Sequence, residues 1–285
     1  MKKVQKRVAA IHDISCFGKC SLTAALPIIS AAGIETAVIP TAVLSTHTGG
    51  FSGYTFRDLT DDILPIARHW KQCGITVDAV YTGYLGSSRQ TELVLQAIEL
   101  IKKSNTLVIV DPVMADDGRL YGGFSPDFPL HMRSLCERAD IITPNITEAA
   151  LLLGVEFMSP PHTEKYIGRL LNGLYALTGS RIVLTGVSFN RQRIGVACFD
   201  GEKTEYVFSE HIDAAYPGAG DAFASALVAA LMHGKSLNAA SAIAVNFICD
   251  AIRLTQKRYP DMKYSVAFEE ALPELIKILE PETLI

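Results

Sequence analysis

Residues 215–227 read Ala215-Tyr216-Pro217-Gly218-Ala219-Gly220-Asp221-Ala222-Phe223-Ala224-Ser225-Ala226-Leu227. The proline and the two glycines predict a tight turn, and glycine also lets the backbone approach a ligand without a side chain in the way. Apolar residues then recur at helical spacing. We therefore expect a helix whose free amides and positive dipole end point out of the glycine turn, where they could hold an anion.

Asp221 lies in the field of that helix N-terminus. A carboxylate there can accept a proton from a hydroxyl, while the amides of Gly218, Ala219 and Gly220 stabilise the negative charge on a transferring group. The alternative is a tight turn with Asp221 as an ordinary helix N-cap, and residue types alone do not decide between the two. A dinucleotide-binding turn is excluded, because Phe223 fills the third small-residue position and Asp221 would repel a pyrophosphate.

Length and composition bound the class of protein. The chain has 285 residues, 49% of them hydrophobic, which is enough for a substantial core. Its net charge of −4 gives no reason to expect nucleic acid or an anionic membrane as a partner. We find no apolar run of about 20 residues and no signal peptide pattern, and the six cysteines are scattered. Reduced thiols and a cytoplasmic location are therefore expected.

Strand-like and helix-like segments alternate along the chain, which predicts an α/β fold with a doubly wound, mostly parallel central sheet and helices on both faces. Residues 107–110 form a nearly pure β-branched run, as expected of a strand buried on both faces. Residues 194–199 and 205–208 alternate around Asp200-Gly201 and predict a hairpin at the sheet edge. Residues 44–54 predict a small lid. We expect one domain that spans residues 1–285.

Polar residues follow several of the predicted strands. Asp111 ends the strand at residues 107–110, and a second strand leads to Asn145 and Glu148, with Thr147 as the expected N-cap of the next helix. Thr185 and Ser188 close a third strand. Because the carboxyl ends of parallel strands meet at one edge of a sheet, these residues and Asp221 are expected in one crevice.

This set of groups suits phosphoryl transfer. That reaction needs a divalent metal on the phosphates, donors for the equatorial oxygens and a base for the attacking hydroxyl. Magnesium keeps most of its waters, so acids that act through water are suitable holders. Asn145 and Glu148 could share such a hydrated cation, or they could only cap a helix.

The order Asn145-x-x-Glu148 followed by Gly218-Ala219-Gly220-Asp221 resembles the paired signature of the ribokinase superfamily, which implies a ribokinase-like fold. Within it, nearly the whole chain resembles the pyridoxal (vitamin B6) kinases. The stretches that carry this resemblance are Ser45-Thr46-His47-Thr48, Gly83-Tyr84-Leu85-Gly86-Ser87, Asp111-Pro112-Val113-Met114 and Thr143-Pro144-Asn145.

The resemblance implies a role for each matching residue. Asp221 would be the base that activates the 5′-hydroxymethyl oxygen of the B6 vitamer, and the amides of residues 218–220 would form the anion hole. Glu148 and Asn145 would organise Mg²⁺ through water, with Asp111 beside them. The remaining positions implied are Asp116 and Tyr121 at ATP, Thr185 and Ser188 at phosphate, and His47, Thr48 and Tyr84 around the pyridine ring. The family is usually a homodimer and often uses K⁺ near the nucleotide.

Asp13 departs from the family pattern. It stands where many pyridoxal kinases carry a serine that contacts the pyridine nitrogen. A carboxylate there would favour the protonated ring nitrogen, as an acid does in enzymes that use pyridoxal phosphate. The departure leaves open which B6 vitamer is preferred.

Two alternative functions remain to be compared. A hydroxymethylpyrimidine kinase shares the fold and the glycine-acid turn, but residues 11–18 lack the serine- and glycine-rich opening associated with those enzymes. A non-catalytic B6-binding protein on this fold would be expected to lack Asp221, which is present.

Overall fold

The computed structural model describes residues 5–280 and contains a nine-stranded sheet in the order β11-β10-β9-β8-β5-β4-β1-β2-β3. Pairing is parallel from β2 across to β9 and antiparallel for β3, β10 and β11. The strands of this sheet are β1 (Arg7–Ser15), β2 (Glu35–Leu44), β3 (Phe56–Asp58), β4 (Ala79–Thr82), β5 (Leu107–Val110), β8 (Ile141–Ile142), β9 (Arg181–Asn190), β10 (Arg193–Phe199) and β11 (Thr204–Glu210).

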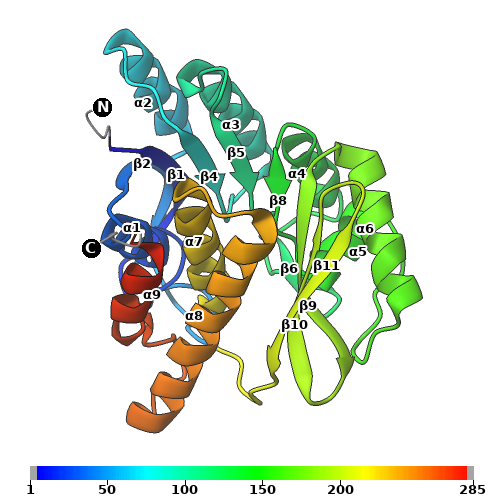
Figure 1. The fold of residues 1–285 in the computed structure, drawn as a ribbon. Coiled ribbons are helices and arrows are strands. Elements are labelled where there is room, and N and C mark those ends of the chain that lie inside the picture. Colours follow the sequence, from blue (N-terminus) through cyan, green and yellow to red (C-terminus); the bar gives the residue numbers. More distant parts are fainter. Residues whose placement is uncertain (1–4, 281–285) are drawn as a thin grey trace, which may run out of the picture.

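Helices cover both faces of this sheet (Figure 1). One face carries α1 (Leu22–Ala31), α7 (Ala219–Met232), α8 (Leu237–Arg258) and α9 (Leu272–Leu279). The other carries α2 (Thr60–Gln72), α3 (Ser88–Ile101), α4 (Phe128–Cys136), α5 (Ile146–Leu153) and α6 (Glu164–Thr178). A short 3₁₀ helix, η1 (Phe268–Glu270), precedes α9, and a separate small hairpin pairs β6 (Ala115–Asp116) with β7 (Arg119–Leu120).

The core is accordingly split into two apolar clusters, one on each side of the sheet. Ile109 of β5 packs into the cluster under α7, whereas Val108 and Val110 pack into the opposite one. A strand that must fill both layers needs apolar side chains at every position, which is why residues 107–110 lack a polar alternation. The predicted mostly parallel α/β fold is therefore confirmed, while the assignment of residues 1–285 to one domain stays a prediction.

Two strand predictions need correction. The expected hairpin is present as β10 and β11, but β9 does not end at Thr185 and instead runs on to Asn190. Gly186 has a φ of 77° and lies where the pairing of β9 with β10 shifts register, so it bends the strand without ending it. Likewise, β1 continues past His12 to Ser15, with an irregularity against β2 between His12 and Ile14.

Among residues 5–280, α8 alone has the length and hydropathy of a membrane-spanning helix. In the fold, its Ala240, Ala244 and Phe247 are buried in the cluster that also contains α7. The apolar composition of α8 is thus accounted for by its place in the core.

Candidate functional site

The glycine-acid turn begins α7. Gly218 is the N-cap, with a φ of 81°, and Asp221 follows in the first turn. A Cβ atom on Gly218 would lie 2.1 Å from the carbonyl oxygen of Lys19, so both the backbone angle and the close packing require glycine. No side chain caps α7, and the interpretation of Asp221 as an ordinary N-cap is therefore wrong.

The first turn of α7 leaves backbone donors available. The amide of Ala219 donates to Tyr216 O at 3.2 Å, but the amides of Gly220 and Asp221 have no acceptor in the described part of the chain. A Cβ atom on Gly220 would meet no atom within 4 Å, so this position faces open space. Unpaired amides at a helix N-terminus that faces open space are the arrangement that an anion needs.

Three acids gather at the carboxyl edge of the sheet beside this turn. Burial raises the pKa of Asp221 to about 7; the Asp13 charge also raises it, while the Ser21 amide lowers it. The pKa of Asp111, directly after β5, is raised well above its usual range by burial and by the charges of Glu148 and Asp221. The predicted convergence of these strand-end acids is thus visible in their mutual electrostatics.

Asn145 and Glu148 form a capping box at the start of α5. Asn145 Oδ1 accepts from the Glu148 amide at 2.8 Å, and Glu148 Oε2 accepts from the Asn145 amide at 2.9 Å. Glu148 Oε1 accepts from the Met114 amide at 3.1 Å. The prediction of Thr147 as the N-cap is therefore wrong, since the Asn145 side chain reaches the N3 amide; the Thr147 hydroxyl instead accepts from the Gly118 amide at 3.0 Å.

The donor set fits a hydrated Mg²⁺ better than a directly caged metal. Residues 5–280 hold no group of three or more His, Cys, Asp or Glu side chains that could bind a metal ion. Asp111 and Glu148 are 8% and 3% exposed, and burial raises the pKa of Glu148 to about 8 even though backbone amides oppose this. Each of these buried acids makes ionisation of the other less favourable, and a bound cation would offset that effect. Mg²⁺ commonly keeps its waters and binds one or two carboxylates.

Asp13, His47 and Tyr84 are neighbours, and Asp13 is also close enough to Asp221 for its charge to act on it. Asp13 is 4% exposed, and its Oδ1 accepts no hydrogen bond among the described residues. Burial raises the pKa of Asp13, and the hydroxyls of Ser21 and Ser15 oppose the rise. Burial and the Asp13 charge raise the pKa of Tyr84 to about 12. The structure thus brings these three predicted residues into one neighbourhood.

His47 is held by its own loop. Its Nδ1 accepts from the Gly49 amide at 3.1 Å, so the ring proton is on Nε2, which donates to Tyr264 O at 2.7 Å. The ring also lies edge-on to Phe51, with 5.0 Å between centroids. Thr48, next in the chain, is exposed. Residues 45–55 are therefore fastened to the segment around residue 264 through His47.

The residues predicted at ATP divide into two groups. Asp116 and Tyr121 lie in and just after the β6–β7 hairpin; burial and the charges of Glu148, Asp116, Asp111 and Asp221 raise the pKa of Tyr121, so its hydroxyl faces the acids. Thr185 forms an isolated bridge with Asn145. Ser188, in contrast, lies inside β9, where its hydroxyl donates to Asn190 O at 2.6 Å. The expectation that Ser188 follows the strand is wrong, because β9 continues through Gly186.

Two residues at the site were missed from the sequence. Ser21 favours the charged forms of both Asp13 and Asp221, which lowers their pKa against the effect of burial, and burial with the charges of Asp111 and Asp221 raises the pKa of Tyr81 in β4. From the sequence, Tyr81 is expected to be an ordinary core residue of a buried strand. A serine at position 21 gives no indication of a positive φ. Neither position had a signal that would distinguish it from core or helix cap.

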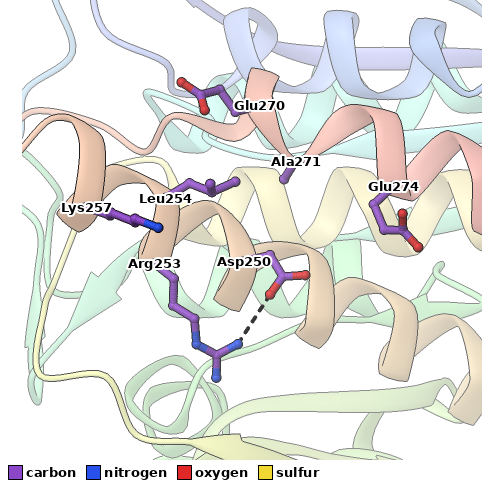
Figure 2. Close-up of a pocket in the computed structure, with 7 residues that line it drawn as sticks. All are labelled: Asp250, Arg253, Leu254, Lys257, Glu270, Ala271 and Glu274. Carbon is purple, nitrogen blue, oxygen red and sulfur yellow. Dashed lines mark hydrogen bonds and ion pairs between the residues drawn. The ribbon is translucent and has the colours of Figure 1, made fainter.

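The hollow in Figure 2 is remote from this chemistry. It measures about 280 Å³, lies between α8 and the segment from η1 to α9, and contains no predicted site residue. Arg253 and Asp250, both on α8, pair at 3.2 Å on one side of it. A second hollow of about 340 Å³ is lined by residues 213–216, directly before the glycine turn, and by Gln256, Pro260 and Lys263. The second hollow is related to the site only because residues 213–216 directly precede the glycine turn.

Comparison with known proteins agrees with this geometry. The phosphomethylpyrimidine kinase family model matches residues 18–265. One similar structure is a Bacteroides thetaiotaomicron protein that is described as a candidate phosphomethylpyrimidine kinase and was crystallised with pyridoxal. It is 36% identical to this chain, with a TM-score of 0.89, and the match covers 95% of this chain and 96% of the relative. Pyridoxal kinase from Lactobacillus plantarum is 30% identical with a TM-score of 0.87, covering 97% and 98%. A Bacillus subtilis pyridoxine kinase is 33% identical over 63% of this chain and 65% of its own length.

The family model covers most of the chain, and the solved relatives match it from end to end in sequence and in fold. The chain belongs to the phosphomethylpyrimidine kinase family of the ribokinase superfamily.

Proposed function

We propose that this protein is an ATP-dependent kinase that phosphorylates the 5′-hydroxymethyl group of a B6 vitamer: pyridoxal, pyridoxine or pyridoxamine. One observation carries the proposal: the partly buried Asp221, with its raised pKa, lies beside unpaired amides at the start of α7 and faces a second pair of acids. The pyridoxal bound to the B. thetaiotaomicron relative and the name of the L. plantarum relative support the B6 vitamer as substrate.

Asp221 acts as the general base. Its pKa of about 7 makes the carboxylate a better proton acceptor than an exposed aspartate while leaving much of it ionised near neutral pH. The hydroxymethyl oxygen attacks the γ-phosphorus and gives its proton to Asp221, while the bond from phosphorus to the ADP oxygen breaks. Of the amides predicted to form the anion hole, that of Ala219 is already donated to Tyr216 O, so the unpaired amides of Gly220 and its neighbour Asp221 stabilise the charge on the transferring phosphoryl group.

Asp111, Glu148 and Asn145 would hold Mg²⁺, largely through its water molecules. When bound, the ion neutralises charge on the phosphates of ATP. Asn145 Nδ2 donates to Ala115 O at 2.8 Å, which fixes the amide next to the hairpin that carries Asp116. In this proposal ATP binds against the hairpin, with Tyr121 and Thr185 close by. Ser188 is a weaker candidate because its hydroxyl already donates to Asn190 O. K⁺ near the nucleotide, a homodimer and a cytoplasmic location stay predictions.

In this proposal the acceptor ring binds between Asp13, His47 and Tyr84, with Thr48 on the neighbouring loop. Within residues 5–280, the buried Oδ1 of Asp13 accepts no hydrogen bond, and a protonated ring nitrogen would supply the missing donor. Tyr84 carries its ring 5.5 Å from that of Phe124, which gives the acceptor an aromatic wall.

A hydroxymethylpyrimidine kinase is the second candidate, and the description of the matching family model favours it. It uses the same base, amides and metal on a similar heteroaromatic alcohol. Only the acceptor separates the two proposals.

The substitution Asp221→Asn should lower kcat for phosphate transfer from Mg-ATP to pyridoxal by about 10²-fold or more, because an amide cannot accept the proton. The rate is measured as pyridoxal 5′-phosphate formed per enzyme. The control Asp61→Asn changes an exposed acid in the first turn of α2 and should leave kcat unchanged. Near wild-type turnover by Asp221→Asn would exclude Asp221 as the base.

The activity should depend on pH in the direction set by Asp221. Because the base must be ionised and burial raises its pKa to about 7, kcat at saturating substrates should fall as the pH is lowered through the pKa of this group in the complex. Magnesium will move that pKa downward, since a nearby cation favours the carboxylate. The measurement is kcat from pH 5 to 9. A profile that is flat down to pH 5 would contradict a titrating base.

The substitution Asp13→Ala should raise the KM for pyridoxal more than the KM for ATP, because Asp13 faces the proposed ring pocket and not the hairpin at Asp116. Steady-state kinetics with each substrate varied in turn gives both constants. Asp13→Asn, which keeps the size but not the charge, is the matched variant. Equal increases in the two KM values would remove Asp13 from the acceptor site.

A further inference from the structure

The segment of residues 264–267, between α8 and η1, supports the side of the proposed site on which His47 lies. Its first residue is half-buried and the next three are buried. Although the segment comes late in the chain, it makes hydrogen bonds to two loops near the start, the loop between β1 and α1 and the loop of residues 45–55. A late segment of the chain therefore supports two early loops.

The 264–267 segment is itself fixed to the core. The Ala267 amide donates to Thr255 Oγ1 at 2.7 Å, and that hydroxyl donates to Ala251 O, also at 2.7 Å, inside α8. Thr255 is fully buried, and Val266 packs in the apolar cluster that contains α7. Close-packed, hydrogen-bonded groups of this kind form a rigid support for the loops that the segment contacts.

Two neighbouring residues of this segment each hold a different loop. Tyr264 O accepts from Nε2 of His47 at 2.7 Å and so holds residues 45–55. Ser265 Oγ accepts from the Lys19 amide at 3.2 Å and so holds the loop between β1 and α1. The partners are 217 and 246 residues apart in the chain, so both bonds belong to the tertiary structure and not to the loops themselves.

The two held loops also pack against each other. The His47 amide donates to Phe17 O at 3.3 Å, and a Cβ atom on Gly18 would lie 2.1 Å from His47 Cδ2. The φ of Gly18 is 89°, so glycine is needed there for the backbone angle as well as for the approach of the ring. The His47 ring is therefore held by Gly18, by the Gly49 amide and by Tyr264 O.

Both loops reach the glycine turn at the start of α7. A Cβ atom on Gly218 would lie 2.1 Å from Lys19 O, and a Cβ atom on Gly49 would lie 3.2 Å from Pro217 Cγ. The backbone of Lys19 thus donates to Ser265 with its amide and packs on Gly218 with its carbonyl. Movement of this loop away from Ser265 would disturb both the His47 ring and the turn.

Lys19 also contacts the same region at the surface. Its Nζ pairs with Glu269 at 2.7 Å, and 26% and 51% of the two side chains are exposed. Exposed ion pairs contribute little, because water and salt screen them. Ser265 is fully buried, so its hydrogen bond to the Lys19 amide is expected to hold the loop more firmly than the ion pair does.

We propose that Ser265 is a positioning residue for the acceptor side of the site, because its hydroxyl holds the loop of Lys19 against the His47 ring and the glycine turn. Tyr264 completes the support by holding the ring through its carbonyl oxygen. The positioning is a property of the unliganded protein, and only its effect on pyridoxal binding rests on the proposed function.

The positioning is tested by NMR hydrogen exchange of single amides in the unliganded protein. In Ser265→Ala the Lys19 amide loses its acceptor, so its exchange should become at least about tenfold faster, while the Ala267 amide, which donates to Thr255, should keep its rate. The control Glu269→Gln removes only the surface ion pair and should leave exchange at Lys19 unchanged. An unchanged Lys19 rate in Ser265→Ala, or the same acceleration in Glu269→Gln, would overturn the proposal.

Steady-state kinetics tests the consequence for the acceptor. Ser265→Ala should raise the KM for pyridoxal by roughly three- to tenfold and leave the KM for ATP within about twofold, because the loop that it holds borders His47. The matched control is Ser180→Ala, which removes a buried hydroxyl directly before β9, at the opposite edge of the sheet. It should lower the melting temperature and change neither KM. Equal increases of both KM values in Ser265→Ala would show a general loss of structure and overturn the positioning role.

A double variant tests whether Ser265 acts through the His47 ring. In the His47→Ala background no ring remains to be positioned, so Ser265→Ala should cause no further rise in the KM for pyridoxal. Additive effects of the two substitutions would overturn this route. If exchange at Lys19 accelerates as expected but the wild type does not phosphorylate pyridoxal, the proposed function fails and the positioning role of Ser265 stands.

Discussion

The site depends on the absence of one side chain. Because Gly218 has no Cβ atom, its backbone packs against the carbonyl of Lys19, which is 2.1 Å from where a Cβ would lie. This contact joins the loop after β1 to the start of α7, two segments about 200 residues apart in the chain. Through it, Asp13 and Ser21 come to lie beside Asp221. The contact thus connects the predicted acceptor pocket with the predicted base.

The rest of the site follows from the topology of the sheet and from burial. The parallel strands β5 and β8 end at the same edge, so Asp111 and the capping box of Glu148 meet there without special loops. Burial then raises the pKa of each acid above its usual range, and their charges oppose one another. Buried acids with raised pKa values accept a proton readily and are stabilised by a bound cation. Phosphoryl transfer needs both a base and a divalent metal.

Much of this could be predicted from the sequence, because the information is local. The β-branched run before Asp111, the hairpin around Asp200-Gly201 and the glycine-acid turn each carry a direct signal. The errors came from features that depend on backbone geometry. Gly186 signals a turn and a bulge equally well, and Asn145 and Thr147 are equally good caps until the side-chain contacts are known. The positive φ of Ser21 depends on tertiary contacts, so its residue type does not predict it.

The most direct test of the account is a comparison of kcat/KM for pyridoxal, pyridoxine, pyridoxamine and hydroxymethylpyrimidine with wild-type protein and Mg-ATP under identical conditions. The account predicts that at least one B6 vitamer is phosphorylated with a higher kcat/KM than the pyrimidine, because the buried carboxylate of Asp13 has an oxygen that can accept from a protonated ring nitrogen. Turnover of the pyrimidine alone would contradict the B6 assignment and retain the mechanism. Turnover of none of the four would contradict both the substrate class and the role of the site.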